Sequence, residues 1–505
     1  MPKKRSVIRN TALSYAGQAY ALLVGILIMP FYLGHMGAEA YGLIGFFSVL
    51  QAWLQLLDAG LSPSLVRAVA HHQGGDAKEY LSGRLLRSFE IIFLPLTALC
   101  CIAMYAGSEW LAVHWLNAKE LSVPTLVQCI SLMGLVIALR LYSTLYKSGI
   151  QGLEQHAWLN IANVVIATLR YFGGLFLVST ISSDPVLFFE FQVLVGLIET
   201  LIFAARAYQQ MPTPSWLTGF DWRLVKPIMP FALSMSGTAV LWILLTQLDK
   251  VLLSEQLPLN EYGYFSLVAL ITTGIMMLSN PLAQTLLPRL TVLMAEGRRD
   301  DMHDLFLAAH RFVCTFLFPL AALIALHPDA LVYAWSGDQT AADWSRPILP
   351  WYALGSAIMA VSAFQFYLQY AYGHMRLHIW YSLVSAVITV PTMYLAIAGY
   401  GALGAGIAWF VLRVVSLAIW PMIVHQRLAP GIHGRWLRDV IRISVMTAVG
   451  LAISEPVLRL IATENRLNTF IGLAVSGLIT LLIVAVSYKP LVTRLSLILS
   501  KPASH

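Results

Sequence analysis

Long runs of apolar residues, separated by short polar segments, recur along almost all of the 505-residue chain. Most runs reach about 20 residues, which is the length that a helix needs to cross the hydrocarbon core of a bilayer. The runs do not alternate apolar with polar positions, as the strands of a membrane barrel would. Because lipid offers no partner to free backbone groups, each run is predicted to be a transmembrane helix.

The pattern predicts an all-α polytopic membrane protein with about fourteen transmembrane helices. Composition agrees, because 58% of the residues are apolar or aromatic and only 11% are charged, against about 25% in a typical soluble domain. These values exclude a soluble enzyme and a disordered chain. The predicted spans are 10–33, 41–62, 85–106, 122–145, 157–181, 186–207, 227–248, 261–283, 312–333, 347–370, 377–398, 401–425, 440–460 and 468–488.

The positions of the basic residues predict the orientation. With the N-terminus in the cytoplasm, the cytoplasmic segments and the span ends beside them carry 24 of the 32 Lys and Arg residues, and the outer segments carry 5. An excess of Lys and Arg on the cytoplasmic side is the rule for multi-pass proteins. Topology therefore explains the net charge of +7, and nucleic acid is not an expected partner.

A short motif occurs twice and predicts an internal repeat. Glu39-Ala-Tyr41-Gly42 stands near the second span, and Glu261-Tyr262-Gly263 stands near the eighth. An offset of six spans makes the two halves parallel in topology, as in transporters whose site lies between two related lobes. The predicted domains are an N-lobe at 1–210, a C-lobe at 211–430, and two further spans with a tail at 431–505.

Arginines inside the spans are candidates for function, because a charge near the bilayer centre costs about 2.5–3.5 kcal/mol on insertion scales. Arg170 lies near the middle of the fifth span and Arg413 in the twelfth. Each shares a helical face with small, polar or aromatic residues. Arg140 lies in the cytoplasmic half of the fourth span, with Ser143 and Lys147 on its face. The three arginines are candidates to bind an anion.

Carboxylates also occur in the spans. Glu199 lies in the middle of the sixth span at a depth that matches Arg140, so these two residues are a candidate ion pair. Asp58 and Glu90 lie near the cytoplasmic ends of the second and third spans. No carboxylate matches the depth of the other two arginines. This favours an anionic ligand for them, with a structural role as the alternative.

Polar and aromatic side chains form stripes along several spans. Such stripes predict the wall of a hydrated cavity, and hydrogen bonding between helices is the alternative. The residues concerned are Gln18, Asn163, Gln365, Gln369 and Trp409.

One motif imitates a nucleotide site. Gly399-Tyr-Gly401-Ala-Leu-Gly404 fits the dinucleotide pattern but stands between two spans, where no strand precedes it. A tight hairpin with close helix packing is the better interpretation.

Three segments, spread along the chain, resemble the signatures of one transporter family. Leu57-Asp58-Ala-Gly60-Leu61 lies in the second span, Lys147-Ser-Gly149-Ile-Gln151-Gly152 follows the fourth, and Thr246-Gln-Leu-Asp249-Lys250 precedes the eighth. Together they resemble the polysaccharide-transport proteins of the multidrug/oligosaccharidyl-lipid/polysaccharide (MOP) superfamily, in particular the O-antigen flippases. The resemblance extends over nearly the whole chain.

The resemblance implies a flippase of the bacterial inner membrane, without cofactor or metal, and not an enzyme. Such a protein moves a polyprenyl-pyrophosphate-linked oligosaccharide from the cytoplasmic to the periplasmic leaflet by alternating access. Glycan polymerase and chain-length machinery are implied partners, beside the substrate and the bilayer. The implied cavity is cationic and lies between the lobes, with Arg140, Arg170 and Arg413 as candidate substrate contacts.

A proton or sodium gradient, or the membrane potential, is the implied driving force. The candidate carboxylates for ion coupling or ion pairing are Asp58, Glu90, Glu199 and Asp249. Sugar selectivity is expected from aromatic and amide side chains in the cavity.

Three alternatives stay open at this stage. A lipid II flippase of the same superfamily has the same cargo chemistry. A multidrug antiporter for organic cations needs an acidic, aromatic cavity, which the arginines argue against. A membrane glycosyltransferase or polymerase needs a large domain outside the membrane, and the extramembrane segments here are short.

Reporter fusions test the predicted orientation. Because the fourteen predicted spans are an even number, both termini are expected in the cytoplasm. Alkaline phosphatase fused at residue 298 is expected to be inactive, since that segment carries Arg289, Arg298 and Arg299 on the cytoplasmic side. An active fusion there contradicts the topology.

Overall fold

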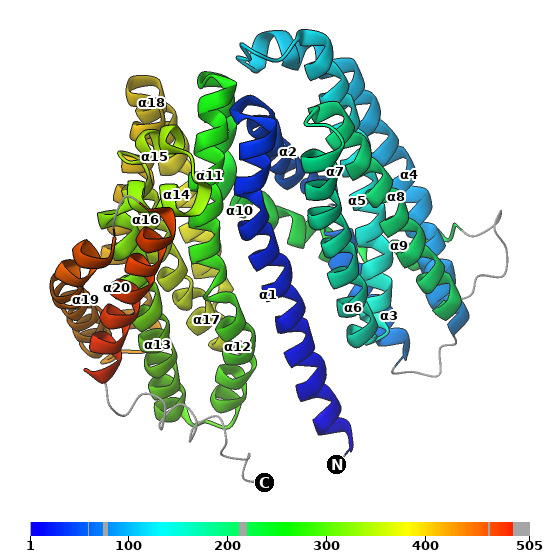
Figure 1. Cartoon of the computed structure of the whole chain (residues 1–505). Helices are drawn as coiled ribbons and strands as arrows, with labels where there is room; N and C mark the ends of the chain where they lie inside the picture. Colours follow the sequence, from blue (N-terminus) through cyan, green and yellow to red (C-terminus); the bar gives the residue numbers. More distant parts are fainter. Residues whose placement is uncertain (1, 59, 74–78, 212–219, 463–464, 488–505) are drawn as a thin grey trace. The chain divides into compact units, whose positions relative to one another are not determined.

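The computed structural model describes residues 2–58, 60–73, 79–211, 220–462 and 465–487 (Figure 1). The elements in these segments are helices, and one isolated bridge pairs Asn117 with Pro258. The chain divides into two compact units, Met1–Gly263 and Tyr264–His505, and each is described by itself. The lobe boundaries at residues 210 and 430 stay a prediction.

The N-terminal unit is built around α5, which packs against α3, α4 and α8. The long helix α1 lies against α6 and α7. The elements of this unit are α1 (Pro2–Met36), α2 (Ala38–Leu54), the 3₁₀ turn η1 (Gln55–Asp58), α3 (Leu61–Gln73), α4 (Glu79–Trp110), the π turn η2 (Leu111–Trp115), α5 (Val123–Gly152), α6 (His156–Thr168), the π turn η3 (Leu169–Gly173), α7 (Gly174–Thr180), α8 (Pro185–Gln210), α9 (Trp222–Val225), α10 (Met229–Gln256) and the start of α11 (Leu259–Met277).

In the C-terminal unit, α13 contacts α16, α19 and α20, and α16 packs along α18. The elements are the rest of α11, then α12 (Asn280–Ala295), α13 (Arg299–Leu326), α14 (Pro328–Ser336), α15 (Gln339–Ser345), α16 (Leu349–Ser362), α17 (Phe364–Ala371), α18 (Met375–Leu428), α19 (His433–Ile461) and α20 (Arg466–Val486).

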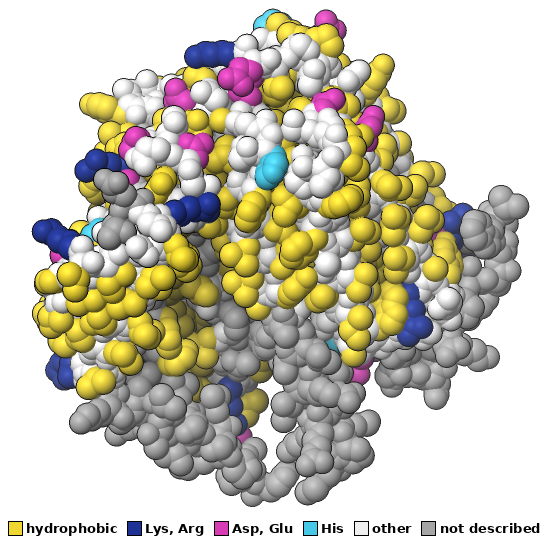
Figure 2. Space-filling model, in the orientation of Figure 1, with side chains coloured by type: hydrophobic (Ala, Val, Ile, Leu, Met, Phe, Trp, Pro, Cys, Tyr) yellow, Lys and Arg dark blue, Asp and Glu magenta, His cyan; other side chains and the backbone are white. Residues whose placement is uncertain are grey.

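The helices are long and apolar enough for a multi-pass membrane protein. Eleven of those in the described residues meet the length and hydropathy of a membrane span, and α18 alone covers two predicted spans. The predicted seventh and eighth spans correspond to α10 and α11. The helices are therefore consistent with fourteen crossings. Figure 2 shows broad areas of exposed hydrophobic side chains, which a bilayer would cover. Leu395 and Val387 of α18 are among the exposed hydrophobic residues.

The glycine-rich segment of α18 is a sharp break between two helical halves. Gly401 has a φ of 57° and a ψ of −139°, a conformation that only glycine adopts without strain. A Cβ on Gly404 would lie 2.0 Å from the carbonyl oxygen of Ala396. The prediction of a tight hairpin with close packing is confirmed.

The repeated motif makes reciprocal contacts near the end of the N-terminal unit. A Cβ on Gly42 would lie 2.2 Å from the carbonyl oxygen of Leu259, and a Cβ on Gly263 would lie 2.3 Å from that of Ala38. The same offset of 221 residues relates Gly42 to Gly263 and Ala38 to Leu259. The two copies of the motif therefore meet as a pair of equivalent surfaces, as two-fold symmetry requires.

Glu39, in the first copy of the repeated motif, accepts hydrogen bonds from the segment between η2 and α5. Its carboxylate, which is 2% exposed, accepts hydrogen bonds from the backbone N–H groups of Lys119, Glu120 and Leu121 at 2.6, 2.9 and 2.9 Å.

A methyl group at Gly42 tests the reciprocal contact. Gly42→Ala is expected to destabilise the protein by about 1–3 kcal/mol, since the added Cβ overlaps a backbone oxygen that cannot move aside. Thermal unfolding of the detergent-purified chain measures the effect. Gly34→Ala is the control, because a Cβ on Gly34 meets no atom within 4 Å. Equal stability of the two variants would show that the helices do not approach this closely.

Candidate functional site

The predicted second span ends in irregular backbone. α2 ends at Leu54, the turn η1 follows, and α3 begins at Leu61. Gly60 has a φ of 69°, and the Asp58 carboxylate accepts a hydrogen bond from the backbone N–H of Ser62 at 3.2 Å. This bond satisfies one of the N–H groups in the first turn of α3, which have no partner within the helix. The predicted span over 41–62 is confirmed as Ala38–Asp58, with a 3₁₀ last turn, and it ends about four residues earlier than expected because a new helix begins at Leu61.

The predicted fifth span contains a second irregular segment. The π turn η3 separates α6 from α7 and carries Arg170. A π turn holds one residue more than an α-helical turn, and single π turns occur often at functional sites. Arg170 is thus presented by backbone that departs from the regular helix.

A cavity of about 150 Å³ lies between these irregular segments and the helices α5 and α8. Its wall is mostly polar, with three cationic side chains and one carboxylate. The lining residues are Gln51, Gln55, Ile137, Arg140, Leu141, Ser143, Thr144, Lys147, Arg170 and Glu199.

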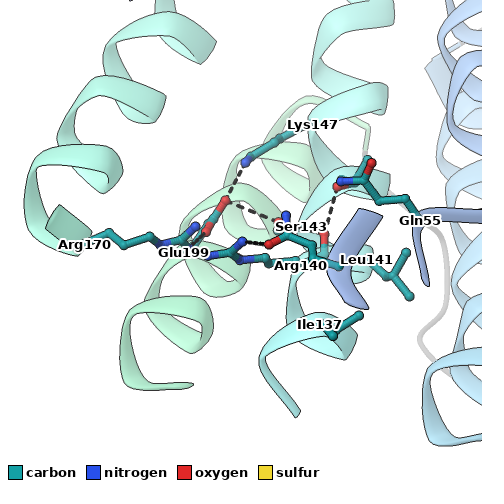
Figure 3. A pocket seen from close by; sticks show the side chains of 10 residues that line it. Gln55, Ile137, Arg140, Leu141, Ser143, Lys147, Arg170 and Glu199 are labelled. Carbon is teal, nitrogen blue, oxygen red and sulfur yellow. Dashed lines mark hydrogen bonds and ion pairs between the residues drawn. The ribbon is translucent and has the colours of Figure 1, made fainter. Parts of the chain in front are cut away.

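Glu199 of α8 is the centre of a buried ion cluster. Its side chain is 4% exposed and forms ion pairs with Lys147 of α5 and Arg170 of η3. Ser143 donates a further hydrogen bond to it at 3.3 Å. Figure 3 shows Lys147 and Arg170 reaching this carboxylate from different helices. A carboxylate inside a membrane bundle needs such partners, because an isolated charge there is costly.

Arg140 lies beside the cluster but pairs elsewhere. Its guanidinium donates to the side-chain oxygen of Gln51 and sits 5.1 Å from the ring centre of Phe47. Among the residues that the structure describes, the Nε–H groups of Arg140 and Arg170 have no hydrogen-bond partner.

Two expectations about these charges were wrong. Glu199 pairs with Lys147 and Arg170 rather than with Arg140, and Arg170 has a carboxylate partner. Depth along a regular helix gives the position of each Cα atom. The π turn and the length of the side chains decide where the charged ends of these residues meet.

Two other candidate carboxylates have structural partners. Asp58 bonds to the first turn of α3, as described above. Glu90 of α4, which is 4% exposed, accepts hydrogen bonds from the hydroxyls of Tyr146 and Tyr208 and from Arg87 at 2.6–2.8 Å. Neither residue lines the cavity. Asp249 lies almost fully buried in α10, 1% exposed.

The predicted site residues of the C-terminal unit lie in its packed interior. Arg413 stacks over the ring of Trp409 at 4.4 Å, and Trp409 packs against Tyr352. The amides of Gln365 and Gln369 are fully buried, and the Gln369 amide donates to the carbonyl of Gln365 at 2.9 Å. None of these residues contributes to the cavity described here.

Two predicted polar positions lie on α1 and α6. Asn163 is half-buried on α6 and does not line the cavity. Gln18 belongs to α1, but its side chain lies outside the described part of the structure.

Sequence reasoning placed Lys147 on the helical face of Arg140 but did not name it as a site residue. It missed Gln51 of α2 and Gln55 of η1, since an amide in a span is less conspicuous than a charge. Within the described segments, no group of three or more His, Cys, Asp or Glu side chains is arranged to hold a metal ion.

Comparison with known proteins identifies the family. The profile of the family described as "Polysaccharide biosynthesis protein" matches residues 7–294, which is more than half of the chain. The chain belongs to the polysaccharide biosynthesis protein family. This confirms the resemblance that the sequence motifs indicated.

One relative and two solved structures extend over most of this member of the polysaccharide biosynthesis family. A Shigella flexneri protein, provisionally described as an O-antigen transporter, is 20% identical over 434 residues, 84% of this chain and 98% of the relative. The lipid II flippase MurJ, in an inward closed conformation, has a TM-score of 0.70 at 14% identity, covering 96% of this chain and all of that chain.

The second structure is an inward-facing multidrug resistance MATE family transporter of the MOP superfamily. Its TM-score is 0.64 at 15% identity, and the match covers 83% of this chain and 98% of that one. At such low identity the two structures show that the family member has a transporter fold.

Removing the charge of Glu199 tests the ion cluster. Glu199→Gln leaves three neighbouring cations without their counter-charge and is expected to lower the free energy of unfolding by about 3 kcal/mol. Thermal unfolding in detergent measures the loss, and the additional change Lys147→Met should restore part of it. Glu190→Gln, an exposed position on the same helix, is the matched control. A Glu199 variant as stable as this control contradicts the cluster.

Proposed function

We propose that this chain is a flippase that moves a polyprenyl-pyrophosphate-linked oligosaccharide from the cytoplasmic to the periplasmic leaflet of the bacterial inner membrane. Family membership and the similarity to an O-antigen transporter support a lipid-linked polysaccharide as the substrate class. The transporter fold supports movement across the membrane without covalent chemistry.

The observation that carries this proposal is the charge of the cavity. Arg140, Lys147 and Arg170 contribute three positive charges, and Glu199 contributes one negative charge. The excess of two positive charges matches the roughly two negative charges of a pyrophosphate diester. Each of its two phosphate groups carries one ionised oxygen at neutral pH. A cation substrate would be repelled from the same wall, which argues against a multidrug cation antiporter.

The free donors of the cluster suit phosphate oxygens. A guanidinium presents its N–H groups as a planar fork that matches phosphate geometry. The guanidinium groups of Arg140 and Arg170 line the cavity, and their Nε–H groups have no acceptor in the described structure. Hydrogen bonds between a cation and a phosphate are about twice as strong as neutral ones.

Glu199 competes with the substrate for the same cations. In the described structure the carboxylate holds Lys147 and Arg170. An arriving pyrophosphate shares or displaces these contacts, and the carboxylate takes them back when the phosphate leaves. In the empty protein the carboxylate offsets one of the three positive charges, because unpaired charge in the membrane interior is costly. It also limits the affinity, which a transporter needs in order to release its cargo.

The cavity is proposed to bind the headgroup of the substrate. Its volume is about 150 Å³, and its charged wall suits the phosphate groups of the headgroup. Outward movement of the anionic headgroup is favoured by the membrane potential, by about 2.3 kcal/mol per charge for each 100 mV.

The other candidate contacts stay predictions. They are Arg413 as a second anion contact, and Gln18, Asn163, Gln365, Gln369 and Trp409 as sugar contacts.

Replacing the cavity cations tests the proposal. In a strain that lacks the native gene, Arg140→Ala, Lys147→Ala and Arg170→Ala are each expected to reduce surface glycan at least tenfold, since each removes a charge from the headgroup site. Arg170→Lys keeps the charge but loses the fork, so partial export is expected. Gel analysis of surface polysaccharide at matched protein levels measures the effect, and Arg413→Ala tests the C-terminal unit in the same way.

The control is Arg206→Ala on α8. Arg206 bonds to Gln155 at 3.0 Å and stacks over Trp158 at 5.2 Å, outside the cavity, so its loss should leave export intact. Wild-type glycan from all three cavity variants would remove the cavity from the mechanism. Loss of viability in the gene deletion, rather than loss of glycan, would favour the lipid II flippase instead.

A further inference from the structure

The π turn η3 determines where Arg170 points. A π turn shifts the side chains on one side of it around the helix axis, because it holds an extra residue. Such a turn is less favourable than a regular helix and persists where surrounding contacts hold it. Inside a membrane, irregular backbone also needs hydrogen-bond partners from neighbouring elements. The form of η3 therefore depends on contacts with neighbouring elements.

One contact is a hydrogen bond from α1. The hydroxyl of Tyr32 donates to the backbone carbonyl of Tyr171, in the middle of η3, at 2.9 Å. Tyr32 is 1% exposed, and its ring packs edge-on against Phe188 at 5.2 Å between centroids. A Cβ on Gly174 would lie 2.5 Å from the Tyr32 hydroxyl oxygen, so the glycine makes room for that hydroxyl. The hydroxyl is therefore fixed against the backbone of the turn.

Neighbouring contacts place α1 against the same segment. The Tyr20 hydroxyl is hydrogen-bonded to that of Thr168 at 2.7 Å, one residue before η3. A Cβ on Gly25 would lie 3.2 Å from the Tyr171 hydroxyl oxygen, so the Tyr171 side chain lies close to α1 as well. Of these contacts, only the one from Tyr32 is a hydrogen bond to the backbone of the turn itself.

We propose that Tyr32 is a positioning residue for Arg170. Its hydrogen bond to Tyr171 holds the π turn, and the turn directs the Arg170 guanidinium to the cavity and Glu199. The functional part of this inference rests on the proposed role of Arg170 in binding the pyrophosphate. Tyr32 itself does not line the cavity, so it acts through the backbone of η3.

Thiol accessibility tests the positioning without any substrate. In a background in which Cys100, Cys101, Cys129 and Cys314 are replaced by Ala, Arg170→Cys is made with and without Tyr32→Phe. A small anionic methanethiosulfonate is the probe. We expect Tyr32→Phe to slow modification at position 170 at least tenfold, because the relaxed turn rotates the thiol away from the cavity.

Arg140→Cys is the control, since Arg140 lines the same cavity from the regular helix α5. Its modification rate should not change with Tyr32→Phe. An unchanged or faster rate at position 170 overturns the proposal. So does an equal slowing at both positions, which would mean that the whole cavity has changed.

A double-mutant cycle tests the link to binding in the natural background. Farnesyl diphosphate is titrated calorimetrically into the detergent-purified chain. Tyr32→Phe and Arg170→Ala are each expected to weaken binding about tenfold, and the double variant should bind no more weakly than Arg170→Ala alone. Tyr20→Phe is the matched control on α1. It should bind normally, because Thr168 keeps a second bond to the Val164 carbonyl at 2.8 Å.

The outcomes separate this inference from the proposed function. Multiplicative losses in the double variant overturn the positioning role, since they show that Tyr32 acts independently of Arg170. Wild-type binding by Arg170→Ala overturns the anion site itself. In that case the thiol experiment still decides whether Tyr32 positions residue 170.

Discussion

A buried carboxylate among three cations is the interaction on which the cavity of the N-terminal unit depends. In a bundle surrounded by lipid, charges are costly without partners, so the carboxylate draws the cations to itself. Glu199 does this by drawing Lys147 from α5 and Arg170 from η3 to one point on α8. The ion pairs therefore hold three elements together and also leave a net positive cavity. The same residues serve stability and the proposed recognition of an anion.

The cavity forms where the backbone is least regular. The turn η1 ends the second predicted span, the π turn η3 lies within the fifth, and both border the cavity. Irregular backbone at membrane depth is tolerated where protein or a hydrated cavity surrounds it. Each segment has its own stabilising contact: the Asp58 carboxylate accepts a hydrogen bond from the Ser62 N–H in the helix after η1, and the Tyr32 hydroxyl donates to the carbonyl of Tyr171 in η3. A charged site in a membrane helix thus depends on contacts from outside its own helix.

The glycines of the repeated motif show a different constraint. Gly42 and Gly263 have no side chain because the opposing backbone carbonyls lie where a Cβ would be. Such close approach is the usual way in which helices pack in lipid, where apolar side chains gain nothing by avoiding water. The reciprocal geometry requires the same residue type at two positions 221 residues apart. The motif is therefore explained by packing, while the ion cluster is explained by charge.

The sequence alone determined the all-helical fold, the family and the candidate arginines. Apolar length and the distribution of Lys and Arg are properties of single segments, and lipid leaves such segments only one stable backbone form. The sequence also indicated Arg170 and Arg140, because a charge in an apolar run is conspicuous. It did not determine their partners. Tertiary structure decided that Glu199 pairs with Arg170 and Lys147, that Arg140 turns to Gln51, and that Gln365 and Gln369 are buried. These outcomes depend on helix breaks, side-chain reach and the rotation of one helix against another. None of these is encoded in the hydropathy of a single span.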